Sequence, residues 1–425
     1  MRIALILLVL FVILLLMKVP IAAAMGISSI VGFLMVGFNM ETIGGIAYSA
    51  VSGPSVLCIP GYVFAGAIMA RGGIADKLVN FLRAWLGHLP GGMALITILG
   101  CAFFAAITGS STATIAAIGA LMIPAMINSD YDESFSMGLV ASAGSLGILI
   151  PPSIPMVLYA TIAEQSVSKL FSAGMVPGLT VCLVYFVYSI IYTGRRKQGR
   201  LPKVPLKERW MITLKAIPAI LLPVAILGCI YGGVMTPNEA AAFACVYAIF
   251  VSFIVYRKMT WKDFKASMVE GVKSSAAIMI IMVSCSMFSQ LLTYERIPHH
   301  ILEAVQRSNL TANGLVIICA GVMIILGCFM DGVSIMLIAA PLMAPVVKAL
   351  GYNMIQFGIV MVVGIQVGQL TPPVGLNLFV VSGMMKKPAV DVIKGAWRPL
   401  ILLLLVWLLV ILWPPLSTWL PTFTK

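Results

Sequence analysis

Two small groups of polar residues interrupt apolar segments of this sequence. Ser110, Ser111 and Thr112 lie in the stretch ITGSSTAT, and Asp331 lies in the stretch CFMDGVS. Hydroxyl and carboxylate oxygens suit a hard cation such as Na⁺, and a carboxylate inside an apolar segment indicates a functional site. Asp331 is also suited to capping the helix that follows it, and small hydroxyl residues also pack between membrane helices. Both interpretations stay open at this point.

Two double prolines lie inside other apolar segments. Pro151 and Pro152 stand in SLGILIPPSIPMV, and Pro372 and Pro373 stand in GQLTPPVGLNLFV. Proline removes a backbone donor and clashes with the preceding turn, so each pair breaks a helix. Broken backbone persists in hydrocarbon only where protein, ions or water meet its polar groups. We therefore predict that free carbonyls at these breaks bind a cation and that helix N-termini bind a carboxylate.

The other candidate site residues flank the interruptions. Four are expected to contribute to cation binding mainly through the backbone: Gly147, Gly332, Gly368 and Thr371. Three polar side chains are candidates for substrate contacts, or alternatively for hydrogen bonds to a neighbouring helix: Ser153, Gln369 and Asn377. No basic residue falls in this region, so a bound carboxylate would depend on helix ends, hydroxyls and the bound cations.

The interruptions recur at a fixed spacing. Pro151 and Pro372 are 221 residues apart. The same offset relates four further pairs: Gly100 and Gly321, Ser110 and Asp331, Pro124 and Pro345, and Gly147 and Gly368. Matches at one offset in positions as special as Gly and Pro indicate an internal repeat. Each half has an odd number of predicted crossings, which predicts an inverted repeat whose breaks meet near the midplane of a membrane.

The composition indicates an integral membrane protein built of helices. Of the 425 residues 61% are hydrophobic and 10% are charged. The apolar runs have helical length, whereas a membrane β-barrel would alternate over about ten residues. The net charge of +13 comes from Lys and Arg between apolar runs, where they orient the chain by the positive-inside rule rather than indicating nucleic acid.

This charge distribution predicts the orientation. The basic stretch RRKQGRLPKVPLKER and most other Lys and Arg fall on one side if the N-terminus is outside. We expect a multi-pass membrane protein with both termini on the outer side; the resemblance described below implies that the membrane is the bacterial inner membrane and that this side is the periplasm. Residues 3–17 are interpreted as the first span rather than as a signal peptide, because the apolar pattern resumes at once.

The predicted organisation has two repeats joined by a basic linker. Repeat 1, residues 1–194, contains scaffold helices at 1–70, an interfacial arm at 74–87, a hairpin at 93–127, a broken helix at 135–163 and a helix at 171–193. The cytoplasmic linker is 195–210. Repeat 2, residues 211–425, contains scaffold helices within 212–293, with spans at 212–233, 238–256 and 270–293, an arm at 297–308, a hairpin at 313–347, a broken helix at 355–382 and a helix at 399–414. No helix is predicted for residues 39–51, which lie between the spans at 20–38 and 52–70.

Several kinds of chemistry find no support in the sequence. The eight Cys form no CxxC pair, the three His have no metal-ligand spacing, and neither HExxH nor GxxxxGK[ST] occurs. We expect no transition metal, no organic cofactor and no enzyme activity, with Na⁺ as the coupling ion. The alternatives are an ion channel, which would show repeated pore loops or charged rings, and a membrane-embedded hydrolase.

The whole chain resembles the large membrane subunit of the tripartite ATP-independent periplasmic (TRAP) transporters. The resemblance depends on GSSTATIAAIG at 109–119, LGILIPPSIPMVLYA at 146–160, FMDGVSIMLIAAPL at 329–342 and GQLTPPVGLNLFV at 368–380. It implies an all-α elevator-type fold in which hairpins and broken helices slide against a scaffold, driven by a Na⁺ gradient. It also implies two partners, a small four-helix membrane subunit and a periplasmic substrate-binding protein. Among the organic anions of this family, sialic acid is favoured here and a C4-dicarboxylate comes next.

Overall fold

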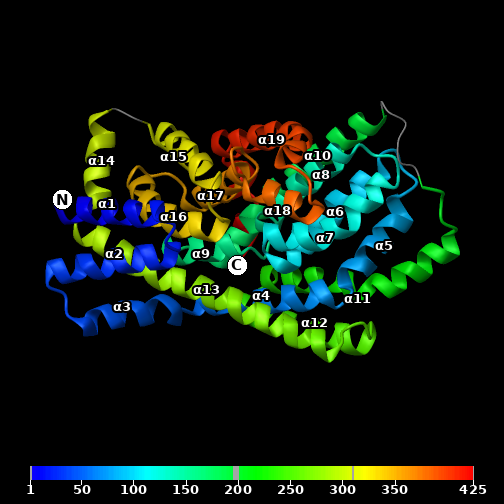
Figure 1. Ribbon diagram of the computed structural model, residues 1–425, viewed down its shortest axis with the longest axis horizontal. Coiled ribbons are helices and arrows are strands. Elements are labelled where there is room, and N and C mark those ends of the chain that lie inside the picture. The colour runs from blue at the N-terminus through cyan, green and yellow to red at the C-terminus, as the bar shows by residue number, and fades with distance from the viewer. Residues whose placement is uncertain (1, 195–200, 309–310, 425) are drawn as a thin grey trace.

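The computed structural model describes residues 2–194, 201–308 and 311–424, and every regular element in these ranges is helical (Figure 1). The elements before residue 195 are α1 (Arg2–Leu16), α2 (Ile21–Val36), α3 (Met40–Ser52), α4 (Pro54–Arg71), α5 (Ile74–Leu86), α6 (Gly92–Thr108), α7 (Ser111–Ile127), α8 (Glu133–Gly144), the 3₁₀ turn η1 (Ser145–Ile148), α9 (Ile154–Ile162) and α10 (Val167–Gly194). The predicted all-α fold is confirmed.

The elements after residue 200 follow a similar order. They are α11 (Leu206–Tyr231), α12 (Pro237–Phe250), the π-helical turn η2 (Val251–Val255), α13 (Trp261–Tyr294), α14 (Ile297–Arg307), α15 (Ala312–Gly327), α16 (Gly332–Ala349), α17 (Met354–Gln369), α18 (Leu376–Met385), α19 (Ala389–Leu412), α20 (Pro415–Thr418) and η3 (Leu420–Phe423). In each half an amphipathic helix, a helix pair and a broken helix occur in that order. The division into two repeat units stays a prediction.

Seven of the described helices are long and apolar enough to cross a membrane: α4, α10, α11, α12 with η2, α13, α16 and α19. The remaining apolar helices, among them α6, α7, α15 and α17, are shorter. The polar interruptions cause this shortening, because each of them splits one apolar segment into two helices. The interruptions predicted at 107–114, at 328–334 and at the two double prolines are all present, and the structure places them at 109–110, 328–331, 149–153 and 370–375.

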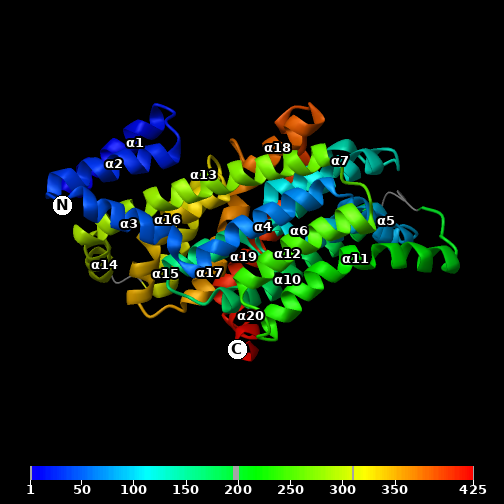
Figure 2. The same ribbon diagram turned by 90° about the horizontal axis from the view of Figure 1, so that it is seen from below.

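The helices form two sides of an elongated molecule. Figure 1 shows α3, α4, α12 and α13 along one side, with α17, α18 and α19 on the other, and Figure 2 shows α4, α12 and α13 from their outer face. α13 packs along α2, α3 and α4, and α4 packs along α12. The broken helices lie deep within the protein, since α8 and α17 are buried around nearly their whole circumference.

Four predicted boundaries were wrong. A helix occupies 40–52, where none was predicted; Asn39 caps it by accepting a hydrogen bond from Thr42 N at 2.9 Å. α13 begins nine residues before its predicted start at 270, because Thr260 and Asp263 form a capping box. α11 and α19 likewise begin before their predicted starts at 212 and 399. Long basic side chains extend from helix ends to the membrane surface, so Lys and Arg do not mark the end of a helix. Residues 195–200 of the predicted linker lie outside the described residues.

Candidate functional site

The first helix pair turns at two residues, Gly109 and Ser110. Gly109 has φ +62°, a left-handed conformation that favours glycine and ends α6. Ser110 is the N-cap of α7, and its hydroxyl accepts from Ala113 N at 3.5 Å. The Ser110 and Thr112 hydroxyl oxygens are 3.1 Å apart, so two half-buried oxygen ligands face each other at this tip.

This tip packs directly on the first helix break. Ile154 N donates to Gly109 O at 3.4 Å, and a Cβ added at Gly109 would lie 2.8 Å from Pro152 O. A Cβ added at Gly147 would lie 2.5 Å from Ser110 O, so only glycine allows η1 to approach the tip. The structure therefore brings Ser110 and Gly147 together, although 37 residues separate them along the chain.

The second helix pair turns at Asp331, which is the N-cap of α16. Its carboxylate accepts from Val333 N at 3.1 Å, from Ser334 N at 3.2 Å and from the Ser334 hydroxyl. The capping interpretation of Asp331 is confirmed. The carboxylate is also exposed, so its outward face is free to bind a cation. Ser110 and Asp331, which the offset of 221 pairs, thus cap equivalent helices.

The second tip packs on the second break. Gly375 N donates to Cys328 O at 2.9 Å. A Cβ added at Gly368 would lie 2.5 Å from Gly327 Cα, so the two backbones touch. A Cβ added at Gly332 would lie 3.4 Å from Gln369 Nε2. Gly332, Gly368 and Gln369 are therefore neighbours at this tip.

The second tip also approaches the first helix break. A Cβ added at Gly332 would lie 3.7 Å from Ile148 Cδ1 of η1. α9, which follows the first break, packs on α16 and α17; α18, which follows the second break, packs on α7 and α8. Each broken helix is thus held by a hairpin of the other half. Both peptide bonds Pro151-Pro152 and Pro372-Pro373 are cis.

Several buried polar side-chain atoms near the helix breaks have no hydrogen-bond partner within the described ranges. Among the described residues, both amide atoms of Gln366 and of Asn377 lack a hydrogen bond, as do Gln369 Oε1 and Ser111 Oγ. Gln366 and Asn377 are 0% exposed. An unpaired buried polar group costs about 1 to 3 kcal/mol, so these side chains are candidates for a hydrogen bond to a ligand.

Two predicted site residues already have local partners. The Ser153 hydroxyl donates to Ile148 O at 2.6 Å and caps α9, and the Thr371 hydroxyl donates to Val367 O at 2.6 Å. These bonds fix the shape of the breaks. Ser153 is 1% exposed, so in this conformation its side chain is a structural cap rather than a free ligand. The hydroxyl bond of Thr371 does not involve its backbone carbonyl, which stays a predicted cation ligand.

Sequence reasoning missed Gln366. It lies one turn before Gln369 on α17 and is more completely buried. Its signal in the sequence is the pair of amides in GIQVGQ, spaced three residues apart on an otherwise apolar helix that ends at a break. That spacing places both side chains on one helix face.

The donors at the tips are hydroxyl, carboxylate, amide and peptide oxygens. Hard cations prefer such oxygens, whereas transition metals are typically bound by imidazole and thiolate. Within the described ranges no cluster of three or more His, Cys, Asp or Glu could hold a metal ion.

An all-helical bundle with long apolar helices, paired hairpins and polar helix breaks defines this protein as a multi-pass membrane transport protein. Residues 8–416 match the family model of the tripartite ATP-independent periplasmic transporter, DctM component. The chain belongs to this family, and its relatives are named as transporter permeases rather than as enzymes.

Two relatives and one solved structure illustrate the similarity. The C4-dicarboxylate TRAP transporter large permease protein DctM of Pseudomonas aeruginosa is 42% identical over 85% of this chain and 84% of its own length. The sialic acid TRAP transporter large permease protein SiaM of Vibrio cholerae is 30% identical over 86% of each chain. The crystal structure of the Alcanivorax borkumensis YdaH transporter shares the fold with a TM-score of 0.66, at 13% identity over 88% of this chain and 89% of that chain.

We predict that Gln366→Leu separates stability from function. Leucine nearly matches the volume and removes an unpaired buried amide, so thermal stability in detergent should hold or rise. Substrate affinity should fall by at least about tenfold if the amide is a ligand, which is the loss expected for one hydrogen bond to a charged group. Thermal unfolding and uptake kinetics of the same preparation measure both effects.

Gln356→Leu is the matched control on α17. Gln356 Nε2 donates to Val410 O at 2.9 Å and to Ile411 O at 3.2 Å. Its replacement should lower thermal stability and leave the KM of folded protein unchanged. Equal behaviour of the two variants would show that Gln366 has no ligand role.

Proposed function

We propose that this chain carries an organic anion across the bacterial inner membrane together with Na⁺, receiving the anion from a periplasmic binding protein. The main support is one observation: two hairpin tips pack on two helix breaks, and buried amides without partners lie beside the breaks. Helix breaks of this kind form the substrate and ion sites of secondary transporters. The chain contains no nucleotide-binding motif, so uphill transport would draw on an ion gradient.

The proposed cation positions are at the tips. α6 and α15 end there and α17 ends at the adjacent break, and the C-terminal ends of helices carry partial negative charge and free carbonyls. At the first tip the hydroxyls of Ser110 and Thr112 lie beside η1, with Ser111 next in sequence. At the second tip the exposed carboxylate of Asp331 and the backbone near Gly368 are the corresponding groups.

The proposed anion position is between the breaks. α9 and α18 begin there, and helix N-termini carry N–H groups and partial positive charge that favour a carboxylate. The amides of Gln366, Gln369 and Asn377 can donate further hydrogen bonds without a fixed charge. A carboxylate held without Lys or Arg is released more easily than one in an ion pair, which suits a carrier.

A C4-dicarboxylate is the first candidate substrate, and sialic acid is the second. The relative named for C4-dicarboxylate is 42% identical to this chain, and the relative named for sialic acid is 30% identical. The earlier preference for sialic acid stays a prediction, with less support from these identities.

The packing supports an elevator-type movement. Because each broken helix packs on a hairpin of the other half, α6 to α9 and α15 to α18 form one interlocked unit. α4 and α13 pack on this unit from outside, with Gly66 against Thr108 and with Cys285 Sγ 2.7 Å from Leu337 O. We propose that the interlocked unit slides along α4 and α13.

The proposed partners are a small four-helix membrane subunit and a periplasmic binding protein. The family name itself describes a tripartite periplasmic system. Exposed apolar side chains on α1, α11 and α13 provide surface for lipid and for the small subunit.

Uptake into proteoliposomes tests the function. Vesicles containing this chain, its small membrane partner and their binding protein should accumulate a labelled C4-dicarboxylate when an inward Na⁺ gradient is present. Labelled sialic acid in parallel vesicles tests the second candidate. Without Na⁺, or with a Na⁺ ionophore, uptake should collapse. Accumulation that does not depend on Na⁺ would contradict the proposal. So would the absence of uptake of both anions when the binding protein is loaded with ligand.

We predict that Asp331→Asn raises the Na⁺ concentration for half-maximal uptake by at least about tenfold, the effect of losing one charged ligand. Asparagine is as good an N-cap as aspartate, so stability should stay within about 0.5 kcal/mol. Ser110→Ala should weaken Na⁺ dependence in the same direction. Thr311→Ala removes the cap of α15, whose Oγ1 accepts from Gly314 N at 3.2 Å, and serves as a cap-loss control. An unchanged Na⁺ dependence of Asp331→Asn would restrict this residue to capping.

We predict that a disulfide between α4 and α6 blocks transport. A Cβ added at Gly66 would lie 3.4 Å from Thr108 Cβ, close to the separation of about 3.5 to 4.5 Å in disulfides. With the eight native Cys replaced, Gly66→Cys with Thr108→Cys should lose uptake on oxidation and regain it on reduction. The control pair Gly119→Cys with Val140→Cys joins α7 to α8 inside the interlocked unit and should leave uptake intact. Full activity of the oxidised α4 to α6 pair would exclude sliding at this contact.

A further inference from the structure

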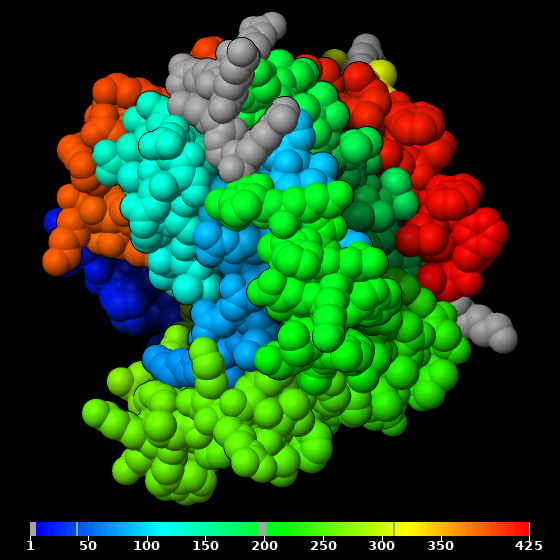
Figure 3. All heavy atoms as spheres, turned by 90° about the vertical axis from the view of Figure 1, so that its right-hand side faces the viewer, coloured from blue at the N-terminus to red at the C-terminus, as the bar shows by residue number. Residues whose placement is uncertain are grey.

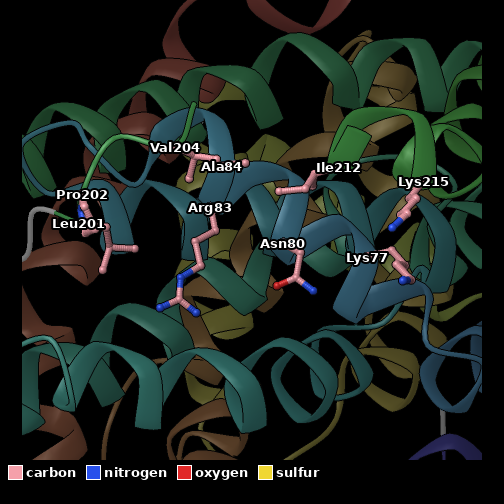
Figure 4. A pocket seen from close by; sticks show the side chains of 9 residues that line it. All are labelled: Lys77, Asn80, Arg83, Ala84, Leu201, Pro202, Val204, Ile212 and Lys215. Carbon is pink, nitrogen blue, oxygen red and sulfur yellow. The ribbon is translucent and has the colours of Figure 1, made fainter. Parts of the chain in front are cut away.

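A basic pocket lies between α5, the segment 201–204 and α11, away from the two tips. Its volume is about 440 Å³. Figure 3 shows this face of the molecule, where α5 is visible between α7 on one side and α11 with the preceding segment on the other. The lining residues, all labelled in Figure 4, are Lys77, Asn80, Arg83, Ala84, Leu201, Pro202, Val204, Ile212 and Lys215.

The charged groups of the pocket are all cations. Lys77, Arg83 and Lys215 line it with the amide of Asn80, and no carboxylate does. In the part of the chain that the structure describes, none of these three cations has an ion pair, whereas nearby Lys258 pairs with Asp76 at 3.1 Å. In Figure 4 the Lys77 and Lys215 side chains extend toward the same end, and Arg83 projects at the other. Lys77 Nζ lies 5.8 Å from the Tyr256 ring centroid, but no carboxylate of the described residues neutralises any of the three cations, and three such cations around one cavity favour an anion.

A fourth cation, Arg209, lies behind the pocket wall. Its Nε donates to the carbonyl of the lining residue Val204 at 2.9 Å, and its guanidinium lies 5.6 Å from the Trp85 ring centroid. Arg209 is 7% exposed, and its Nη2 lacks a hydrogen bond within the described residues. Arg209 does not itself line the pocket, but its bond to Val204 fixes the pocket wall and its charge adds to the positive potential there.

The surroundings place the pocket at the level of lipid headgroups. Trp85 and Trp210 form an edge-to-face pair 6.4 Å apart beside it, and tryptophan is typical of the membrane interface. Leu201, Pro202 and Ile212 add apolar lining, which suits a glycerol backbone and the start of an acyl chain. The distribution of Lys and Arg predicts that this side is cytoplasmic, where anionic lipids attract basic residues.

We propose that this pocket binds the phosphate of an anionic phospholipid headgroup, held by Lys77, Arg83 and Lys215. The bound lipid would join α5 to α11 and stabilise the chain segment before α11. Asn80 and Arg83 also line a second cavity of about 310 Å³ that extends to α6 and α7, so the headgroup lies beside the first hairpin. This inference does not depend on the transported anion, and its test does not measure transport.

Native mass spectrometry of the delipidated, purified chain tests the proposal with phosphatidylglycerol, with phosphatidylcholine of the same acyl chains and with inorganic phosphate. The triple variant Lys77→Gln, Arg83→Gln, Lys215→Gln should bind phosphatidylglycerol at least about tenfold more weakly, because each surface cation contributes to anionic-lipid attraction. Binding of phosphatidylcholine should not change.

The matched control is Lys262→Gln, Lys265→Gln, Lys273→Gln on α13. These exposed lysines line another groove that includes Glu270, and their loss removes the same charge. The control should keep its phosphatidylglycerol affinity within about twofold, since screened surface charge alone has little effect. Equal losses in both triple variants would overturn the proposal, and so would unchanged binding in the first.

Two further arms complete the test. The native chain could retain inorganic phosphate that the first triple variant does not retain, and yet bind no phosphatidylglycerol. That result would show that the pocket binds free phosphate and would overturn the lipid assignment. If the triple variant does not fold, single substitutions of the exposed Lys215 test the proposal instead. Lys215→Gln should weaken phosphatidylglycerol binding about threefold and Lys215→Arg should preserve it, as expected for one cation. Equal affinities of these two variants would contradict a role for its charge.

Discussion

The structure depends on one constraint: a helix that breaks inside an apolar bundle must satisfy its backbone polar groups without water. This protein meets the constraint by placing a hairpin tip on each break. Ile154 N bonds Gly109 O at the first break, and Gly375 N bonds Cys328 O at the second. Glycine is needed there because backbone must approach backbone, as at Gly147 and Gly368.

The two helix breaks are shielded from solvent to different degrees. Residues 145–160 around the first break are all buried, whereas Pro372 and Pro373 at the second break are exposed, as is Asp331 at the tip beside it. The two breaks thus differ in exposure in this conformation. Under the proposed transport function, alternating access requires such a difference between the two halves.

The sequence predicted the interruptions because Gly and Pro report directly on backbone conformation. The offset of 221 identified Ser110 and Asp331 as equivalent before any geometry was known, and both are N-caps. It could not identify α3, because Gly44 and Gly45 lower its helix propensity and only its packing on α13 compensates. The sequence also could not predict that the Ser153 hydroxyl donates a hydrogen bond to Ile148 O, because that bond depends on the local backbone conformation of the break.

Two glutamines on one helix show why a buried polar residue cannot be assigned from type alone. Gln356 and Gln366 both lie on α17 and are almost fully buried. Gln356 bonds the carbonyls of Val410 and Ile411, and therefore anchors α19. Gln366 has no partner among the described residues. A protein that retains such a group without a partner forgoes stability that leucine would supply, and a ligand that completes the hydrogen bonds restores it. The unpaired amides beside the breaks are therefore where binding energy is available.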